Sequence, residues 1–214
     1  MSTLVVNEIF HSIQGESTRA GLPSAFIRLT YCNLRCTYCD TEYAFHEGTM
    51  MSVEEILRTV SGYACNLVLV TGGEPLVQEG VHDLLRLLCD KGYETLLETG
   101  GSLDIRPVDQ RVRRIVDFKC PGSGMEPKNL WSNVAVLRPT DEVKFVVRDQ
   151  RDFEWTVGKI REHALEDRCP ILVSPVFGEL DPAELADWIL QAGLSARLQL
   201  QLHKLIWEPS ARGL

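Results

Sequence analysis

The sequence predicts an α/β fold in which parallel strands alternate with helices in an incomplete TIM-type barrel of about six β/α units. Short apolar runs of strand length alternate with amphipathic helical patterns along most of the chain, as in parallel βαβ units with right-handed crossovers. The 214 residues are fewer than the roughly 250 that a closed eight-unit barrel usually takes. With the N-terminal segment set aside, six or seven units fit, and we expect one domain over residues 1–214.

The first β/α unit is well marked. Residues 25–30 (AFIRLT) are the first predicted strand and lead directly into a cysteine-containing loop. Residues 53–63 are the first predicted helix, because Ser52 and Glu55 have the spacing of a capping box. Residues 67–71 (LVLVT) form a continuous apolar run, which is typical of a strand buried on both faces.

The alternation continues to the end of the chain. A second helix is predicted over residues 77–90, with Gly92 as its stop and one apolar face formed by Val81, Leu84, Leu85 and Leu88. Further strands are predicted at residues 94–98, 115–119, 143–147, 171–174 and 197–201, and further helices at residues 151–165 and 182–191. Polar and glycine-rich segments follow the strand ends (GGEP, ETGGS, KCPGSG and HK). In a barrel this face carries the active site.

Composition and charge restrict the class of protein. The formal net charge is −8, whereas nucleic-acid binders usually carry a basic surface, so we expect a small-molecule substrate and no nucleic-acid partner. No apolar run approaches the ~18 residues of a membrane span, and the first ten residues, MSTLVVNEIF, are too short and polar for a secretory signal. Seven cysteines, an odd number, argue against a disulfide framework, and we expect a reducing, cytoplasmic location.

Cys32, Cys36 and Cys39 are spaced as C-x3-C-x2-C and carry the strongest functional signal. Three thiolates can bind three irons of a [4Fe–4S] cluster and leave the fourth iron open, whereas electron-transfer clusters usually have four cysteine ligands. The best-known occupant of such an open iron is S-adenosylmethionine. The alternative is a structural zinc site that adds His46 as a fourth ligand. The remaining cysteines are expected to pack as small apolar residues: Cys65, Cys89, Cys120 and Cys169.

The GGEP segment follows a predicted buried strand. Its two glycines allow a backbone to approach a ligand closely, and Pro75 suits a first helical turn. Gly73 and Glu74 are therefore candidates to bind the ammonium group of an amino-acid-like ligand. The alternative is a strand-to-helix turn with a helix-capping acid.

The cysteine loop and GGEP together are similar to the radical S-adenosylmethionine superfamily. Five further segments resemble its 7-carboxy-7-deazaguanine synthase family, in order from residue 7 to residue 209: FHSIQGE, GLPSAFIR, CDT, ETGGS and QLHK. The resemblance implies a homodimer with the radical SAM fold. It also implies conversion of 6-carboxy-5,6,7,8-tetrahydropterin to 7-carboxy-7-deazaguanine with loss of ammonia, on the route to queuosine and other deazapurines. The implied cofactors are a [4Fe–4S] cluster, S-adenosylmethionine and Mg²⁺, and an external electron donor such as a flavodoxin is expected.

The resemblance also assigns roles to residues of this chain. The cysteines Cys32, Cys36 and Cys39 would bind the cluster, and Thr41 would bind Mg²⁺. The N-terminal segment would bind substrate, and the implied substrate contacts are Ile13, Gln14, Gly15, Glu16, Arg28, Thr99, His203 and Pro209. The implied cofactor contacts are Tyr38, Cys39, Asp40, Gly73, Glu74, Gly101, Asp117, Phe118, Lys119, Ser174 and Pro175. Arg28 has the planar fork that suits a carboxylate, but it could instead form a barrel salt bridge or pair with Glu16.

The chain departs from the family pattern at three places. Asp117-Phe118-Lys119 replaces Ser-Pro-Lys, Leu202 replaces a threonine before the histidine, and residues 210–214 continue past Pro209. Two other functions compete with the synthase assignment. A glycyl-radical-enzyme activase shares the cysteine spacing but acts on a protein partner, and a metal-binding module would have no catalytic activity.

Overall fold

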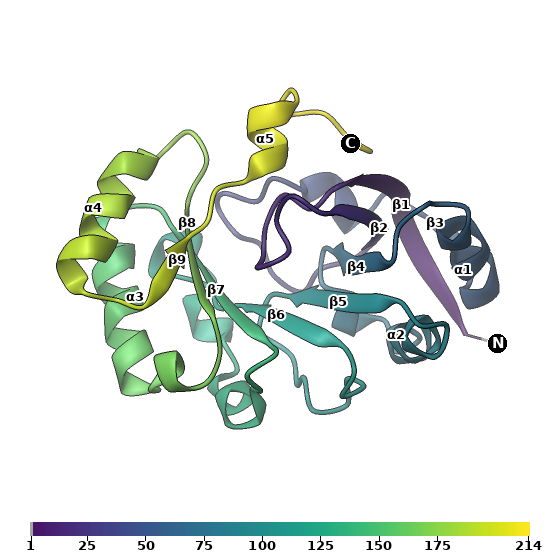
Figure 1. The fold of residues 1–214 in the computed structure, drawn as a ribbon, viewed down its shortest axis with the longest axis horizontal. Helices are drawn as coiled ribbons and strands as arrows, with labels where there is room; N and C mark the ends of the chain where they lie inside the picture. Colours follow the sequence, from purple (N-terminus) through teal and green to yellow (C-terminus); the bar gives the residue numbers. More distant parts are fainter. Residues whose placement is uncertain (1) are drawn as a thin grey trace.

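The computed structural model describes residues 2–214, which form one nine-stranded sheet in the order β3-β1-β2-β4-β5-β6-β7-β8-β9 (Figure 1). From β2 to β9 every neighbouring pair is parallel, and β3 and β9 are the two edges. The sheet is therefore open, which confirms the incomplete barrel. The parallel strands are β2 (Pro23–Leu29), β4 (Leu67–Gly72), β5 (Glu94–Thr99), β6 (Arg113–Asp117), β7 (Glu142–Val147), β8 (Ile171–Pro175) and β9 (Ala196–Leu198).

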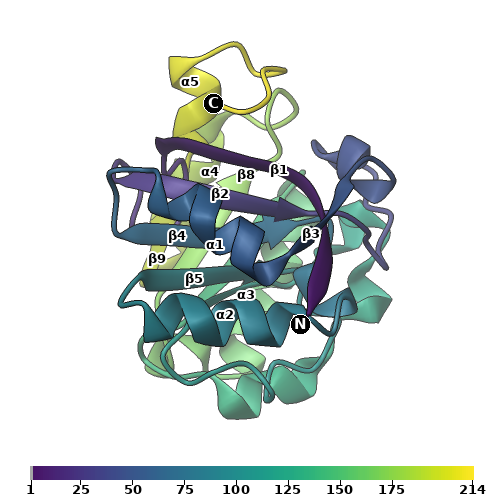
Figure 2. The ribbon, with the colours of Figure 1, turned by 90° about the vertical axis from the view of Figure 1, so that its right-hand side faces the viewer.

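Helices cover the outer face of this sheet. The α-helices are α1 (Val53–Ser61), α2 (Val81–Asp90), α3 (Gln150–Glu162), α4 (Pro182–Ala192) and α5 (Leu202–Ile206). Short 3₁₀ turns are η1 (Glu42–Phe45), η2 (Pro75–Val77), η3 (Pro121–Ser123), η4 (Glu126–Lys128), η5 (Trp131–Val136) and η6 (Leu165–Asp167). Figure 2 shows α1 and α2 on the same face of β4 and β5. Of the helices in residues 2–214, none has the length and apolar character that a membrane-spanning segment requires.

The helix α1 forms as predicted. The backbone N–H of Ser52 donates to Glu55 Oε2 at 2.8 Å, and the Glu55 N–H donates back to Ser52 Oγ at 3.3 Å. This reciprocal pair satisfies two of the free N–H groups at the helix start. The predicted apolar face of α2 is also confirmed, since Val81, Leu84, Leu85 and Leu88 are fully buried.

The predicted start of α2 at residue 77 is wrong by four residues. Pro75 begins the 3₁₀ turn η2, and α2 begins only at Val81. Between them, Gln78 is held in an extended conformation because its side-chain amide bonds the backbone of Val5 and Thr30. A tertiary contact therefore overrides the local helical pattern.

The middle of the chain departs from strict alternation. No α-helix lies between β5 and β6 or between β6 and β7 in the described residues, and η3, η4 and η5 occupy the second connection. The strand predicted over residues 115–119 ends at Asp117. The Asn129 side-chain amide bonds both the N–H and the carbonyl of Lys119, at 2.8 and 2.9 Å, and so directs the chain away from the sheet.

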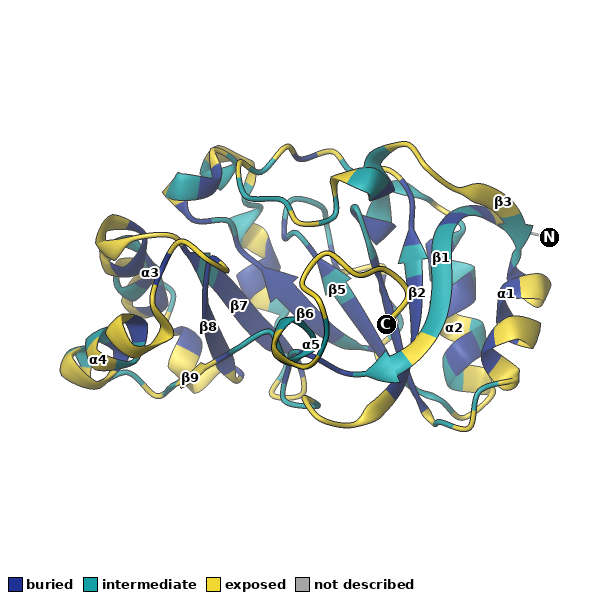
Figure 3. Ribbon diagram, turned by 90° about the horizontal axis from the view of Figure 1, so that it is seen from above, coloured by how far each residue is buried: buried dark blue, intermediate teal, exposed yellow. Residues whose placement is uncertain are grey.

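The C-terminal predictions also need correction. The helix predicted to residue 165 ends at Glu162, because Ala164 adopts a left-handed conformation with φ of 47°. The last strand was predicted over residues 197–201, but β9 has only three residues, and His203 lies in the short helix α5. Figures 1 and 3 show α5 above the middle of the sheet.

The N-terminal segment forms strands that the sequence did not predict. β1 (Thr3–Ile13) pairs antiparallel with β2 and with the short β3 (Thr49–Ser52). The rings of Phe10 and Phe26, opposite each other in β1 and β2, stack at 4.8 Å. Figure 3 shows that the central parallel strands are mostly buried, whereas β1 is largely intermediate and the outer faces of the helices are exposed.

Candidate active site

A cavity of about 600 Å³ opens at the carboxyl ends of the parallel strands. Most of the predicted site residues line it: Ile13, Gln14, Gly15, Glu16, Arg28, Cys32, Cys36, Tyr38, Cys39, Asp40, Thr41, Gly73, Thr99, Asp117, Lys119, Ser174, Pro175, His203 and Pro209. Three predicted residues, Glu74, Gly101 and Phe118, do not line it. Ser210 and Leu214, past the predicted contact at Pro209, also face the cavity.

The Glu74 carboxylate lies outside the cavity lining, and its predicted contact with the cofactor stays a prediction. This side chain is fully buried and accepts hydrogen bonds from the Thr99 hydroxyl and the N–H groups of Gly100 and Leu76, at 2.7 to 3.0 Å. Its burial raises the carboxyl pKa, although those donors oppose the shift. Glu74 thus caps η2 and fixes the ETGGS turn, as in the helix-capping alternative.

Phe118 and Gly101, two other predicted cofactor contacts, also lie outside the cavity lining. The Phe118 side chain is fully buried and stacks on Trp131 with ring centroids 4.5 Å apart, so it belongs to the core. Gly101 has φ of 68°, and a Cβ at this position would lie 3.1 Å from Phe118 Cδ1. This glycine is required by the turn and by packing against the core.

The cysteine loop provides three half-buried thiols on one wall of the cavity. Burial raises the pKa of Cys32 and Cys36, so a bound metal is needed to hold them as thiolates at neutral pH. The loop is anchored by the Tyr31 N–H to the Ala44 carbonyl at 2.9 Å and by the Thr37 N–H to the Ser123 carbonyl at 3.0 Å. A Cβ on Gly73 would collide with the Tyr31 carbonyl, so only glycine allows GGEP to approach the loop.

This donor set fits an iron–sulfur cluster. In such a cluster each of the three cysteines would bind a separate iron, so their sulfurs need not converge on one metal position. Within residues 2–214, no group of three or more His, Cys, Asp and Glu side chains is arranged to hold a single metal ion. The proposed fourth zinc ligand, His46, lies outside the cavity lining.

A tight turn places residues 14–16 at the opposite wall. Gln14 exchanges backbone hydrogen bonds with Gly21 and Leu22, each 2.8 Å long. The Gln14 side chain is buried, and its Nε2 group has no hydrogen-bond partner. Because an unpaired buried donor costs about 1–3 kcal/mol, Gln14 indicates a bound acceptor.

The short helix α5 packs against the same turn. The Leu202 N–H donates to the Gly15 carbonyl at 3.0 Å, and any Cβ on Gly15 would collide with the His203 ring. Burial lowers the pKa of His203, with Glu16 opposing the shift. His203 therefore faces the cavity as a neutral imidazole at neutral pH.

Asp40 ties the cysteine loop to α5. Its carboxylate accepts from Lys204 Nζ at 2.6 Å and from Gln201 Nε2 at 3.4 Å. The Asp40 side chain is about half exposed. Partial desolvation by the surrounding protein opposes its ionisation, but Lys204 outweighs this and lowers the pKa of Asp40 to about 2. The hydroxyl of the neighbouring residue Thr41 lies 3.8 Å from Cys39 Sγ. On the other side of Cys39 in the sequence, the Tyr38 hydroxyl donates to the Val146 carbonyl at 3.0 Å.

A partly exposed set of charged and aromatic residues surrounds Arg28, which we call the rim network: Glu8, Arg28, Tyr43, Glu47 and Arg212. Arg28 Nε donates to Glu8 Oε1 at 2.7 Å, and the Tyr43 hydroxyl donates to the same oxygen at 3.1 Å. The guanidinium of Arg212 lies 3.7 Å from the centroid of the Tyr43 ring. Because only Nε of Arg28 is engaged with Glu8, its two terminal nitrogens are left to face the cavity.

Comparison with known proteins identifies the family. Residues 26–163 match the model of the radical SAM superfamily. A 7-carboxy-7-deazaguanine synthase from Chlorobaculum tepidum is 47% identical over 213 residues, which cover 98% of this chain and 97% of the relative. One from Koribacter versatilis is 42% identical, with 97% and 99% covered. The chain belongs to the 7-carboxy-7-deazaguanine synthase family.

Solved structures agree with this assignment at the level of the fold. The crystal structure of QueE from Escherichia coli matches with a TM-score of 0.76 at 23% identity, covering 92% of each chain. A TYW1 structure with a lysine-pyruvate adduct matches with a TM-score of 0.61 at 12% identity, over 81% of this chain. Membership of a radical SAM family implies a [4Fe–4S] cluster and S-adenosylmethionine, which favours the cluster over the zinc site.

Charged residues at the bottom of this synthase-family cavity form a set that we call the floor network. It consists of the predicted residues Glu16, Asp117 and Lys119 together with Glu98 and Lys144, which sequence reasoning missed. Lys144 interrupts the apolar run of β7, and that charge within a buried strand was the signal available. Glu16 pairs with Lys144 and not with Arg28, the alternative that the sequence left open.

Proposed function

We propose that this chain converts 6-carboxy-5,6,7,8-tetrahydropterin to 7-carboxy-7-deazaguanine, with loss of ammonia, in the biosynthesis of queuosine and other 7-deazapurines. One observation carries the proposal. A single cavity brings the three cysteines together with Gln14, Glu16 and Arg28. The near full-length similarity to relatives named as this synthase supports the same substrate.

The cluster would be held by Cys32, Cys36 and Cys39, with the S-adenosylmethionine contacts contributed by Gly73, Asp117 and Lys119. Bound together, cluster and S-adenosylmethionine supply the radical chemistry that starts the reaction. The protein residues orient the two ligands and keep water out of the cavity. Tyr38, Ser174 and Pro175 line the same cavity and are assigned to the cofactor side.

The substrate carboxylate is assigned to Arg28. Glu8 engages Nε of this guanidinium at 2.7 Å, which fixes the plane of the fork. The terminal nitrogens can then bind both carboxylate oxygens, a geometry that favours arginine over lysine. Gln14 Nε2, which has no partner, suits the carbonyl oxygen of a pterin ring. Thr99, His203 and Pro209 complete the proposed substrate contacts.

A magnesium ion is assigned to Thr41. This ion prefers oxygen ligands and usually keeps several waters while it binds substrate oxygens. The Asp40 carboxylate is engaged by Lys204 and Gln201, so the Thr41 hydroxyl, which lines the cavity, is the better ligand. We further propose that residues 1–214 act as one catalytic domain in a cytoplasmic homodimer, reduced by an external donor such as a flavodoxin.

Anaerobic reconstitution tests this function. The chain is loaded with iron and sulfide and then incubated with S-adenosylmethionine, Mg²⁺, a reductant and the carboxy-tetrahydropterin. The expected result is about four irons per chain and the ultraviolet absorption of the deazapurine product, with S-adenosylmethionine used catalytically. A loaded protein that cleaves S-adenosylmethionine but leaves the pterin unchanged would overturn the proposal.

A further inference from the structure

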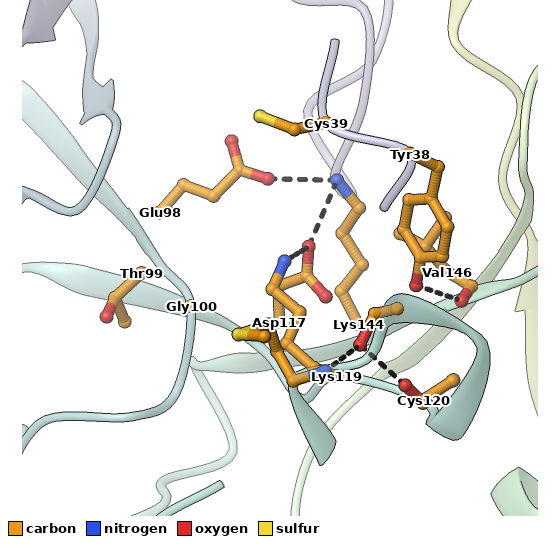
Figure 4. A network of polar contacts seen from close by, with 12 residues as sticks. Tyr38, Cys39, Glu98, Thr99, Gly100, Asp117, Lys119, Cys120, Lys144 and Val146 are labelled. Atoms are coloured by element: carbon orange, nitrogen blue, oxygen red, sulfur yellow. Dashed lines mark hydrogen bonds and ion pairs between the residues drawn. The ribbon is translucent and has the colours of Figure 1, made fainter. Parts of the chain in front are cut away.

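Lys144 is the centre of the floor network (Figure 4). Its side chain is only 7% exposed, and carboxylates from three different segments converge on its ammonium group. Glu98 Oε1 on β5 lies 2.9 Å from Nζ, and Asp117 Oδ2 on β6 lies 3.9 Å away. The third is Glu16, in the turn after β1. Lys144 therefore joins the N-terminal segment to the central strands of the sheet.

The charge on this lysine is permanent at neutral pH. Burial alone would lower the pKa of Lys144, but Glu16, Glu98 and Asp117 outweigh it and hold that pKa well above the ordinary value. An ammonium group that holds its proton so firmly is a poor proton donor. Its chemistry is therefore that of a fixed positive charge.

The orientation of Glu16 depends on that charge. Gln201 Nε2 donates to Glu16 Oε1 at 2.8 Å, and Lys144 pairs with Oε2. The second carboxylate, Glu98, is held between Lys144 and the Thr71 hydroxyl, which donates at 3.3 Å. Each carboxylate oxygen can accept two hydrogen bonds, so both groups keep capacity for a ligand. Both also line the cavity.

We propose that Lys144 is a positioning residue for substrate recognition, holding Glu16 and Glu98 as paired acceptors for the N–H donors of a reduced pterin ring. This inference rests on the proposed function. The amino group and ring N–H groups of a tetrahydropterin need fixed acceptors, and carboxylates provide the strongest ones. Without the lysine, two carboxylates that share one wall would repel each other or take up a proton.

Lys119 provides a matched control. It is also a lysine of the floor network, but its Nζ pairs with Asp117 at 2.9 Å, and within residues 2–214 it forms no ion pair with Glu16 or Glu98. Burial alone would lower the pKa of Lys119, but Asp117 and the Cys36 thiol outweigh it, and the proposed function assigns Lys119 to the cofactor. Replacing Lys119 should therefore affect the cofactor, and replacing Lys144 should affect the substrate.

The test uses the reconstituted holoenzyme and four variants: Lys144→Met, Lys119→Met, Glu16→Gln and the double variant Lys144→Met/Glu16→Gln. Equilibrium binding gives the Kd of the carboxy-tetrahydropterin and of S-adenosylmethionine, and steady-state assays give KM and kcat. For Lys144→Met we expect the pterin Kd and KM to rise at least about tenfold, as for a lost charged hydrogen bond. The S-adenosylmethionine Kd should stay within about twofold of wild type, whereas Lys119→Met should raise it.

The double variant separates positioning from general destabilisation. If Lys144 acts through Glu16, Lys144→Met raises the pterin Kd less in the Glu16→Gln background than in the wild type. Three results would overturn the inference. The pterin Kd could rise equally in both backgrounds, or it could stay unchanged in Lys144→Met. The third result is a loss of S-adenosylmethionine affinity in Lys144→Met as large as that in Lys119→Met.

Two further outcomes are informative. If Lys144→Met yields no folded holoenzyme, the variants Glu16→Gln and Glu98→Gln test the inference instead. Weaker pterin binding with unchanged S-adenosylmethionine affinity in these variants supports the inference. An unchanged pterin Kd overturns it. A wild-type enzyme that binds the pterin but forms no product refutes the proposed function while the binding comparison still tests Lys144. A wild type that does not bind the pterin overturns both.

Discussion

All five residues of the floor network line the cavity, whereas Arg28 alone of the rim network does, and water reaches the two networks differently. In the floor network, the Lys144 and Asp117 side chains are less than a tenth exposed. In the rim network, exposure rises outward from the Arg28–Glu8 pair, about a sixth exposed, to the Arg212–Glu47 pair, more than half exposed. Since exposed ion pairs are screened and buried ones are not, similar contacts should contribute very differently to binding.

Cys36→Ala has the largest expected effect on turnover. It removes a predicted cluster ligand and leaves the residues of both networks unchanged. Loss of one of three cluster ligands should reduce iron to near background and abolish turnover. Neither network includes Cys36, so the circular dichroism spectrum of the apo chain should stay that of the wild type. An active variant with full iron content would show that Cys36 is not a ligand.

Arg28→Ala has the next largest expected effect and tests the Arg28–Glu8 pair of the rim network. Truncating a charged group that binds a carboxylate typically costs several kcal/mol, so kcat/KM for the pterin should fall about 100-fold or more. Cleavage of S-adenosylmethionine without product formation should persist, because the cysteine loop is untouched. Chromatography of cleaved cofactor and deazapurine measures this uncoupling. Normal turnover would mean that another residue binds the substrate carboxylate.

Glu8→Gln should have an intermediate effect. Glutamine keeps the shape and can still accept from Arg28 Nε and the Tyr43 hydroxyl, but it removes the negative charge that orients the guanidinium. We expect kcat/KM to fall about tenfold, mainly through KM, as for one weakened charged hydrogen bond. The steady-state constants of Glu8→Gln and Arg28→Ala measured side by side test this order. A larger loss in Glu8→Gln than in Arg28→Ala would contradict it.

The sequence predicted the parallel core of the sheet better than its edges. Residues 67–71 were recognisable because both faces of β4 are buried and the four residues 67–70 are all apolar. β1 was missed because polar residues such as Glu8 and His11 interrupt its apolar pattern. Those interruptions place Glu8 beside Arg28, so the features that concealed the strand are the ones that build the rim.

Only those parts of the site that lie within one short sequence segment could be predicted from the sequence. The cysteine spacing and IQGE are local, and the structure brings them to one cavity. The partner of Glu16 is not local, because Lys144 lies on a strand far along the chain. The surroundings of Glu74 are not local either, since its carboxylate accepts from Thr99 and Gly100 at the neighbouring strand end.

A pH experiment tests His203, which lines the cavity beside the turn that carries Glu16. Burial lowers its pKa in the folded chain, so the fold favours the neutral ring. As pH falls below about 6.5, the unfolded chain binds a proton that the folded chain does not, and stability is lost until the lower folded pKa is passed. The apo chain should therefore melt at a lower temperature at pH 5.5 than at pH 7.5, and His203→Gln should reduce this difference. The control His46→Gln removes an exposed imidazole, and an equal reduction there would refute the assignment.

Arg212→Ala has the smallest expected effect and tests the outer rim. Arg212 pairs with Glu47 at 2.9 Å and lies over the Tyr43 ring, but its side chain is half exposed. An exposed ion pair contributes about 0–1 kcal/mol and an exposed cation–π contact about 0.5–1 kcal/mol. Because Arg212 does not line the cavity, we expect only a small part of this energy to affect substrate binding. The value of kcat/KM should then fall less than about threefold, and less still at high salt. Arg106→Ala, another exposed arginine paired with a nearby aspartate, is the control outside the cavity. A loss as large as that of Glu8→Gln would mean that substrate binding excludes water from the outer rim, because only then would the exposed pair act like a buried one.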